Sequence, residues 1–275
     1  MKNIPFLGTG IGFRPELKSF IFLNRDKIDF LEIIADHYID VPESKWEELS
    51  FLKKHFTLIP HAINLSLGSA DGINEAYLEK LIRVIDFIQP PYWSEHISYT
   101  QSHGYDIGHL SPVIFSNEFL AVLEKNILYV KSKTSCPLIL ENITYHIEFA
   151  GREYNDAAFL NTLCEKTGCG LLLDITNAFI NSKNLGFDPL AFIDELNAET
   201  ITQLHYVGYE DSPSQVIDTH ARQTQPEIFA LMEHVLKRHT PKGILLERDD
   251  RFELADELIA DLTRAKEILQ KASAC

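Results

Sequence analysis

The sequence predicts a (β/α)8 barrel, the TIM barrel of the α/β class, as a single domain over residues 1–275. Eight short runs rich in β-branched and other apolar residues alternate with longer amphipathic stretches. Strand–helix units in succession imply a parallel sheet, and 275 residues is the usual size of this barrel. Since no linker rich in Pro, Ser or Gly divides the chain, we expect one catalytic barrel domain.

The eight runs define the expected strands, at residues 6–12, 28–34, 57–63, 92–98, 137–142, 170–177, 203–208 and 243–249. Between them, apolar residues at i, i+3 and i+4 spacing predict helices that include residues 78–88, 119–130 and 254–268. Asp40 with Glu43 fits a capping box, and Gly168 fits a helix end. These signals agree with the strand–helix alternation.

A doubly wound open sheet is the structural alternative. Such a sheet usually opens with a G-x-G-x-x-G turn, whereas here Gly8, Gly10 and Gly12 are followed by Phe13. The spacing does not match, so the barrel is favoured.

The charge balance excludes several partners. Lys and Arg number 25 against 40 Asp and Glu, a net charge of −15, which argues against nucleic acid and against an anionic membrane surface. No apolar run approaches the ~20 residues of a membrane span, and the N-terminus lacks a signal-peptide pattern. The four cysteines form no C-x-x-C pair, as expected for reduced thiols. We therefore expect a cytoplasmic protein that binds neither nucleic acid nor membrane.

Polar residues recur where the expected strands end, which in a TIM barrel is where the chemistry takes place. Asp218 and His220 follow the seventh strand, and Asn142 and Asn177 supply amide oxygens nearby. Six further candidate ligands end the strands themselves: His61, His96, Glu141, Asp174, His205 and Glu247. One such residue alone is more often a hydrogen-bonded structural group, so the recurrence at one end of many strands carries the signal.

Glu141 and Glu247 each follow an apolar tripeptide, where an unpaired buried carboxylate would cost several kcal/mol. Few cationic side chains are expected near the barrel mouth (Arg14 and Arg248), so metal cations could neutralise the cluster. His, Asp, Glu and Asn ligands suit zinc, manganese or iron, and nine candidates exceed the needs of one ion. Metal-assisted hydrolysis, isomerisation and oxygen activation by iron all stay open, including a zinc or manganese enzyme of the endonuclease or sugar-isomerase type.

Segments across nearly the whole chain resemble, in order, the motifs of one family, the multinuclear non-haem iron-dependent oxidative enzymes, which include the methanobactin-biosynthesis oxidase. The segments are residues 10–16, 60–69, 94–98, 140–142, 168–177, 204–205, 217–220 and 246–249. The resemblance implies a (β/α)8 barrel that holds two or three irons, in mixed ferrous and ferric states, with dioxygen as co-substrate. It implies modification of cysteines in a ribosomally made precursor peptide, by Cβ–H abstraction through an iron-superoxo species, and a partner protein that binds the leader peptide.

The resemblance also implies a ligand set. His61, His96 and Glu141 would hold one iron, and Asp174, His205 and Glu247 a second, with Glu141 as a candidate bridge. Asn177, Asp218 and His220 would hold the third. No catalytic residue beyond the metal ligands is assigned.

Two departures from the family pattern fall near the expected pocket mouth. The second strand usually ends in a Glu-Asn pair and here ends in Asp36-His37, and Tyr209 stands where a second His usually follows His205. Substrate contacts are expected from five residues: Arg14, Asp36, His37, Asn142 and Tyr209. A plain loop role for Asp36 and His37 is equally open. The loop 208–215 is expected to overlie the mouth.

Overall fold

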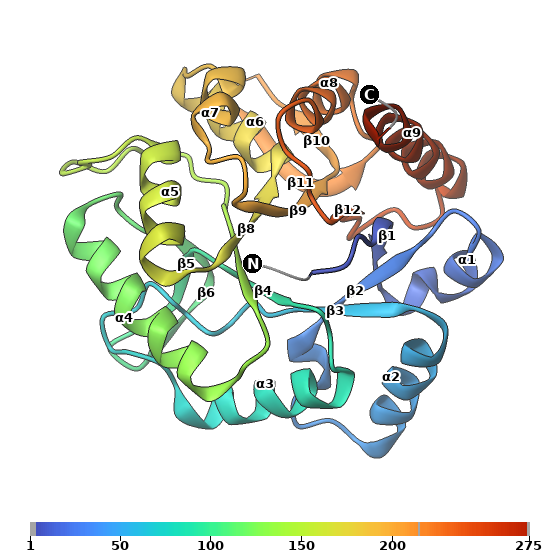
Figure 1. Ribbon diagram of the computed structural model, residues 1–275, viewed down its shortest axis with the longest axis horizontal. Coiled ribbons are helices and arrows are strands. Elements are labelled where there is room, and N and C mark those ends of the chain that lie inside the picture. Colours follow the sequence, from blue (N-terminus) through green and yellow to red (C-terminus); the bar gives the residue numbers. More distant parts are fainter. Residues whose placement is uncertain (1–3, 214, 274–275) are drawn as a thin grey trace.

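Eight parallel strands close into a barrel in a computed structural model that describes residues 4–213 and 215–273. The order around the barrel is β1-β12-β9-β8-β7-β4-β3-β2 (Figure 1). The strands are β1 (Gly8–Gly12), β2 (Phe30–Ile34), β3 (Thr57–His61), β4 (Trp93–His96), β7 (Leu138–Glu141), β8 (Gly170–Asp174), β9 (Ile201–Tyr206) and β12 (Gly243–Leu246). The predicted TIM barrel is confirmed.

Helices surround the barrel on its outside (Figure 1). They are α1 (Lys18–Leu23), α2 (Glu43–His55), α3 (Glu75–Ile88), α4 (Asn117–Lys133), α5 (Asp156–Thr167), α6 (Ile175–Leu185), α7 (Pro189–Glu195), α8 (Pro226–Leu236) and α9 (Ala255–Ser273), with 3-10 turns η1 (Pro15–Leu17) and η2 (Ala35–Tyr38). In the described ranges, no helix has the length and apolar character needed to cross a membrane.

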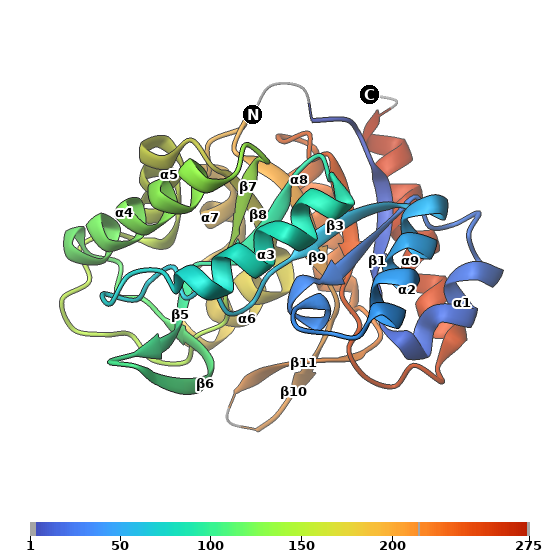
Figure 2. The ribbon, with the colours of Figure 1, turned by 90° about the horizontal axis from the view of Figure 1, so that it is seen from below.

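Two β-hairpins that the sequence did not predict extend from the same end of the barrel (Figure 2). One pairs β5 (Ser98–Ser102) with β6 (Tyr105–Pro112), and the other pairs β10 (Gly208–Asp211) with β11 (Val216–Arg222). The expected strand 92–98 is therefore interrupted after His96, and Ser98 already belongs to a hairpin. The expected loop 208–215 begins with the strand β10, and its residue 214 lies outside the described residues. Asp218 and His220 lie on β11.

Two further expectations about element ends need correction. The expected strand 170–177 ends at Asp174, because its carboxylate caps α6 by accepting a hydrogen bond of 2.6 Å from the Asn177 backbone N–H. The capping box of Asp40 and Glu43 is wrong: α2 begins after Pro42, with no side-chain cap. Gly168 does end α5, in the left-handed conformation with φ 64°.

The barrel interior is apolar toward its amino end. Its buried cluster consists of Phe30, Ile59, Tyr92, Ile139, Leu172 and Leu245, against which Ile4 and Leu7 pack. Gly10 makes room for this cluster, because a Cβ there would stand 2.7 Å from the Phe30 ring. We call the six residues the apolar layer.

Side chains two residues apart on a strand point the same way, so the next inward positions lie one layer closer to the carboxyl end. Those positions carry Glu32, His61, Ser94, Glu141, Asp174, His205 and Glu247. We call these seven residues the polar layer. The apolar layer thus fixes where the ligand-type side chains point.

Candidate metal centre

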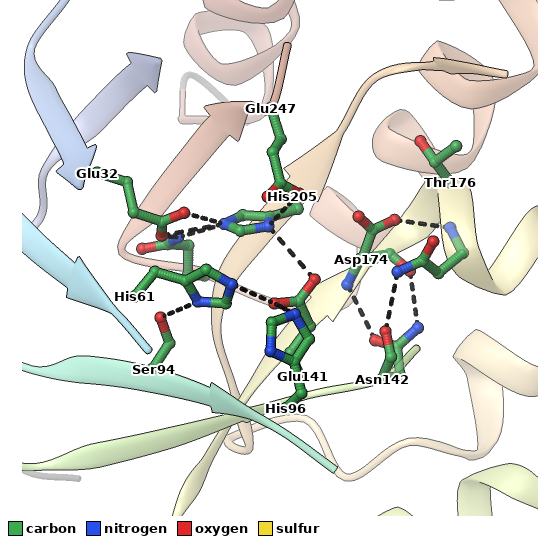
Figure 3. A network of polar contacts seen from close by, with 12 residues as sticks. Glu32, His61, Ser94, His96, Glu141, Asn142, Asp174, Thr176, His205 and Glu247 are labelled. Carbon is green, nitrogen blue, oxygen red and sulfur yellow. Dashed lines mark hydrogen bonds and ion pairs between the residues drawn. The ribbon is translucent and has the colours of Figure 1, made fainter. Parts of the chain in front are cut away.

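The first group of ligand-type side chains is His61, His96 and Glu141, which come from three adjacent strands (Figure 3). Glu141 Oε2 stands 3.4 Å from His61 Nε2 and 3.5 Å from His96 Nε2. These separations are in the range of ion pairs, yet Oε2 meets the geometry of no hydrogen bond. All three side chains are buried, and their donor atoms converge as a metal ligand set would.

A second group consists of Glu141, Asp174, His205 and Glu247. His205 Nδ1 lies 3.1 Å from Glu247 Oε2 and 3.5 Å from Glu141 Oε1. Glu141 therefore turns one carboxylate oxygen toward each group. This geometry favours the predicted bridging role of Glu141.

The third predicted set is brought together only in part. His220 Nε2 lies 2.9 Å from Asp218 Oδ1, but the metal-type group that contains His220 is completed by Glu247 and Asp249. Asn177, in the first turn of α6, has a buried Oδ1 without a hydrogen-bond partner. Asp249 was not predicted as a ligand, although it is the last residue of the segment 246–249 that carries the family resemblance.

Each imidazole of the first two groups also contacts an oxygen with its other ring nitrogen. His61 Nδ1 lies 2.8 Å from Ser94 Oγ, and His96 Nδ1 lies 3.3 Å from Glu95 Oε1. His205 Nε2 lies 3.0 Å from Glu32. Metal-bound histidines characteristically have such outer partners, which orient the ring.

Sequence reasoning missed Glu32 and Glu95. A signal for Glu32 existed, because a carboxylate interrupts the otherwise apolar run of 30–34 two residues after Phe30, at an inward position. Glu95 points the other way from Ser94 and accepts hydrogen bonds from the Leu65 and His96 backbone N–H groups. The role of Glu95 as the outer partner of His96 is visible only in the three-dimensional structure.

The electrostatics of the centre follow from burial and from mutual charge. Burial raises the pKa of Asp174 to about 8, aided by the neighbouring Glu141 carboxylate. Burial opposes the charged form of His96, but Glu141 and Glu95 outweigh it and raise the pKa of His96 to about 9. The pKa of Glu141 is lowered despite burial, because His205 and His96 lie beside it. Protons on the imidazoles thus neutralise the carboxylates when no other cation does.

Among the described residues, four buried oxygens of the centre meet the geometry of no hydrogen bond: Glu141 Oε2, Asp174 Oδ2, Asn177 Oδ1 and Asp218 Oδ1. Two of them, Glu141 Oε2 and Asp218 Oδ1, lie within ion-pair distance of imidazole nitrogens. Buried polar atoms are nearly always paired in native proteins. Unpaired oxygens next to convergent imidazole nitrogens are the donor set that first-row divalent metals bind. The residues present therefore fit metal ions.

Three of the expected substrate contacts, Asp36, His37 and Arg14, differ in whether their side chains already bond to other parts of the protein. Asp36 accepts hydrogen bonds from Ile63 N (3.1 Å) and Tyr77 OH (2.8 Å), so its carboxylate holds the segment after β3. His37 is exposed beside it. Arg14 Nε donates to Asp249 Oδ1 at 2.7 Å. Of these three residues, His37 is the one whose side chain is exposed, so the predicted substrate contact suits it best.

The two other expected contacts are also tied to the scaffold. Asn142 Nδ2 donates to the Asp174 carbonyl and Asn142 Oδ1 accepts from its N–H, both at 2.9 Å, which links β7 to β8 at the centre. Tyr209 is buried on β10, its ring 5.1 Å from that of Phe179. Its backbone N–H and carbonyl both bond the Gln225 side chain.

A barrel of this topology with imidazoles and carboxylates gathered at the carboxyl ends of its strands defines a TIM-barrel enzyme with candidate metal sites. The particular family follows from comparison with known proteins. Residues 8–270 match the model of the RiPP precursor modification enzymes MbnB/TglH/ChrH, which act on ribosomally synthesised and post-translationally modified peptides, and the chain belongs to this family. The resemblance inferred from the motifs is confirmed.

Similar proteins cover nearly the full chain. A UPF0276 protein of Caulobacter vibrioides is 31% identical over 263 residues, which cover 95% of this chain and 94% of that protein. A UPF0276 protein of Acaryochloris marina is 30% identical over 260 residues, covering 94% and 93%. Among solved structures, D-psicose 3-epimerase from Clostridium cellulolyticum H10 superposes with a TM-score of 0.61 at 12% identity, over 97% of both chains. At that identity the likeness concerns the fold.

Proposed function

We propose that this protein is a multinuclear, iron-dependent, dioxygen-using oxidase that modifies cysteine residues of a ribosomally synthesised precursor peptide. The observation that carries the proposal is Glu141, whose two oxygens face two separate ligand groups. A carboxylate in that position suits a bridge between two metal ions. The family supplies the peptide as the substrate class.

Three sets of side chains would hold the irons. His61, His96 and Glu141 form the first set, and Asp174, His205 and Glu247 the second. Asn177, Asp218 and His220 are proposed for the third, with Asp249 next to His220. Bound iron would supply a site for the cysteine thiolate and for dioxygen, and with them the means to remove a hydrogen from the cysteine Cβ.

The chain itself contributes burial, orientation and proton control. The polar layer is almost fully shielded from water, with Asp174 and His205 at 0% exposure, so charges there interact strongly. Ring nitrogens of His61 and His96 are aimed at Glu141 by Ser94 and Glu95. The proton on His96 must leave before that ring can bind a metal ion.

The partners we propose are a Cys-containing precursor peptide and a second protein that binds the leader peptide; nucleic acid and membranes are not among them. The two hairpins stand at the barrel end that carries the polar layer, where a peptide must enter (Figure 2). The surplus of 40 acidic over 25 basic residues favours a basic leader or partner.

The test is a reaction with a defined peptide. Iron-loaded protein is mixed with a Cys-containing precursor peptide and its leader-binding protein, both taken from adjacent reading frames, under air and under argon. We expect an oxygen-dependent mass change at the cysteine, absent from the Cys→Ser peptide. The competing zinc or manganese hydrolase or isomerase would instead turn over abasic DNA or a ketose without consuming oxygen. That result would contradict the proposal.

A further inference from the structure

Glu32 lies inside the barrel, behind the His205 ring as seen from Glu141 and Glu247 (Figure 3). It is 3% exposed. Although Glu32, His61 and Glu247 also form a metal-type group, Glu32 belongs to none of the three ligand sets proposed above. A buried carboxylate at such a position is costly unless its oxygens are engaged. Its partners therefore indicate what it does.

The two ring nitrogens of His205 face opposite neighbours. Nε2 lies 3.0 Å from the Glu32 carboxylate, whereas Nδ1 lies 3.1 Å from Glu247 Oε2 and 3.5 Å from Glu141 Oε1. Behind Glu32, Gln203 Nε2 donates to Glu32 Oε2 at 2.7 Å. Tyr92 OH donates in turn to Gln203 Oε1 at 2.6 Å.

Both ring nitrogens of His205 face carboxylates, so each could donate a proton to one of them. A metal ion bound at Nδ1 would leave the ring proton on Nε2, where Glu32 accepts it. An ionised carboxylate only accepts hydrogen bonds, so an unprotonated Nε2 at 3.0 Å would set lone pair against lone pair. With the proton on Nε2, the lone pair of Nδ1 points toward the second ligand group. Gln203 Nε2 also lies 2.9 Å from His205 Nε2. Gln203 cannot replace Glu32 as the acceptor by reversing its amide, because its Oε1 would then face the Glu32 carboxylate.

We propose that Glu32 is a positioning residue for the metal centre: it keeps the proton of His205 on Nε2 and so presents Nδ1 as a ligand. This inference rests on the metal centre that the proposed function requires. His61 has only the neutral Ser94 hydroxyl in the corresponding place, which makes the His205 partner the stronger one. Loss of such partners typically lowers metal affinity about 10- to 100-fold.

The experiment uses Zn²⁺ as a diamagnetic probe on the full chain. Zinc affinity is measured by chelator competition for the wild type, Glu32→Gln and Glu32→Ala. Long-range ¹H–¹⁵N spectra of the imidazoles report the tautomer of His205. Asp261→Asn is the matched control, since Asp261 is also buried (1% exposed) and hydrogen-bonded, but to Thr224, outside the centre.

We expect wild-type His205 to bind zinc through Nδ1 with Nε2 protonated. Glu32→Ala should weaken one class of zinc site about 10- to 100-fold and alter the His205 signals, while Glu32→Gln, which keeps an acceptor, has a smaller effect. Asp261→Asn should change neither readout. If Glu32→Ala does not fold, the positioning role is tested with Glu32→Gln alone, by comparing its His205 imidazole signals with those of the wild type.

Wild-type zinc affinity and an unchanged His205 tautomer in a folded Glu32 variant would overturn the positioning role and leave the metal centre intact. A wild-type protein that binds no zinc, iron or manganese would overturn the centre itself, and the role of Glu32 with it.

Discussion

The two layers that fill the barrel interior share their strands and differ in their chemistry. Ile139 and Leu172 of the apolar layer are buried. Glu141, two residues after Ile139, and Asp174, two residues after Leu172, are buried as well. Solvent exposure therefore does not explain why the polar layer carries polar side chains. Buried carboxylates without partners would cost several kcal/mol each. The same scaffold therefore supports one layer by packing and the other by imidazoles and, in the proposed function, by metal ions.

The largest effect should come from the shared carboxylate. Glu141→Ala removes a donor from both ligand groups and should reduce metal affinity and peptide modification by at least about 100-fold, beyond the loss of an outer partner. Metal content and peptide mass spectrometry measure both. A variant that modified its peptide normally would show that this cluster is not the active centre.

A matched change in the apolar layer should act on stability alone. Leu172→Ala leaves a cavity in a fully buried site and should lower the free energy of unfolding by about 2–5 kcal/mol. Denaturant titration measures the loss, and the metal content of the folded variant should match the wild type. Leu128→Ala, at a 45% exposed position, is the control, with a change within about 0.5 kcal/mol. Metal loss without destabilisation would contradict the division of roles between the layers.

The polar layer and the adjacent His96 should also respond to pH, whereas the apolar layer should not. The pKa of His96 is raised to about 9 and that of Asp174 to about 8, so both groups carry protons at neutral pH that a metal ion must displace. Metal affinity should therefore rise with pH, by up to about tenfold per unit for each group below its pKa, and peptide modification should fall in acid. Calorimetry in buffers of different ionisation enthalpy detects the released protons. Affinity that is flat between pH 6 and 8 would contradict this.

The smallest effect is expected at the mouth. Tyr209→Phe keeps the ring against Phe179 and the backbone bonds to Gln225, so stability should change by less than about 0.5 kcal/mol and metal affinity hardly at all. Thermal unfolding and chelator competition measure both. A tenfold fall in metal affinity would mean that the hydroxyl reaches the centre, whereas a fall in peptide affinity alone would confirm the predicted substrate contact.

The strands and the ligand-type residues at their ends could be predicted, because apolar runs closed by a single His, Asp or Glu are visible in one sequence. Glu141, for example, ends Leu138–Glu141 as expected. The hairpin β10–β11 was not predicted, although its partners, such as Asp211 and Val216, are close in sequence. The polar segment 208–215 lacks the apolar alternation that indicates a strand. Glu32 was missed for another reason: its carboxylate is visible within the apolar run 30–34, but its role exists only through His205, 173 residues away in the chain.

The proposed function requires that carboxylates and imidazoles of the polar layer, together with His96, hold several metal ions just beyond the apolar layer. Protein purified anaerobically with iron supplied should be analysed for metal content and by Mössbauer spectroscopy, beside Glu141→Ala. We predict two or three irons per chain, at least two of them magnetically coupled through the site that Glu141 bridges, and loss of that coupling in the variant. Uncoupled iron at no more than one equivalent, unchanged by Glu141→Ala, would contradict the account.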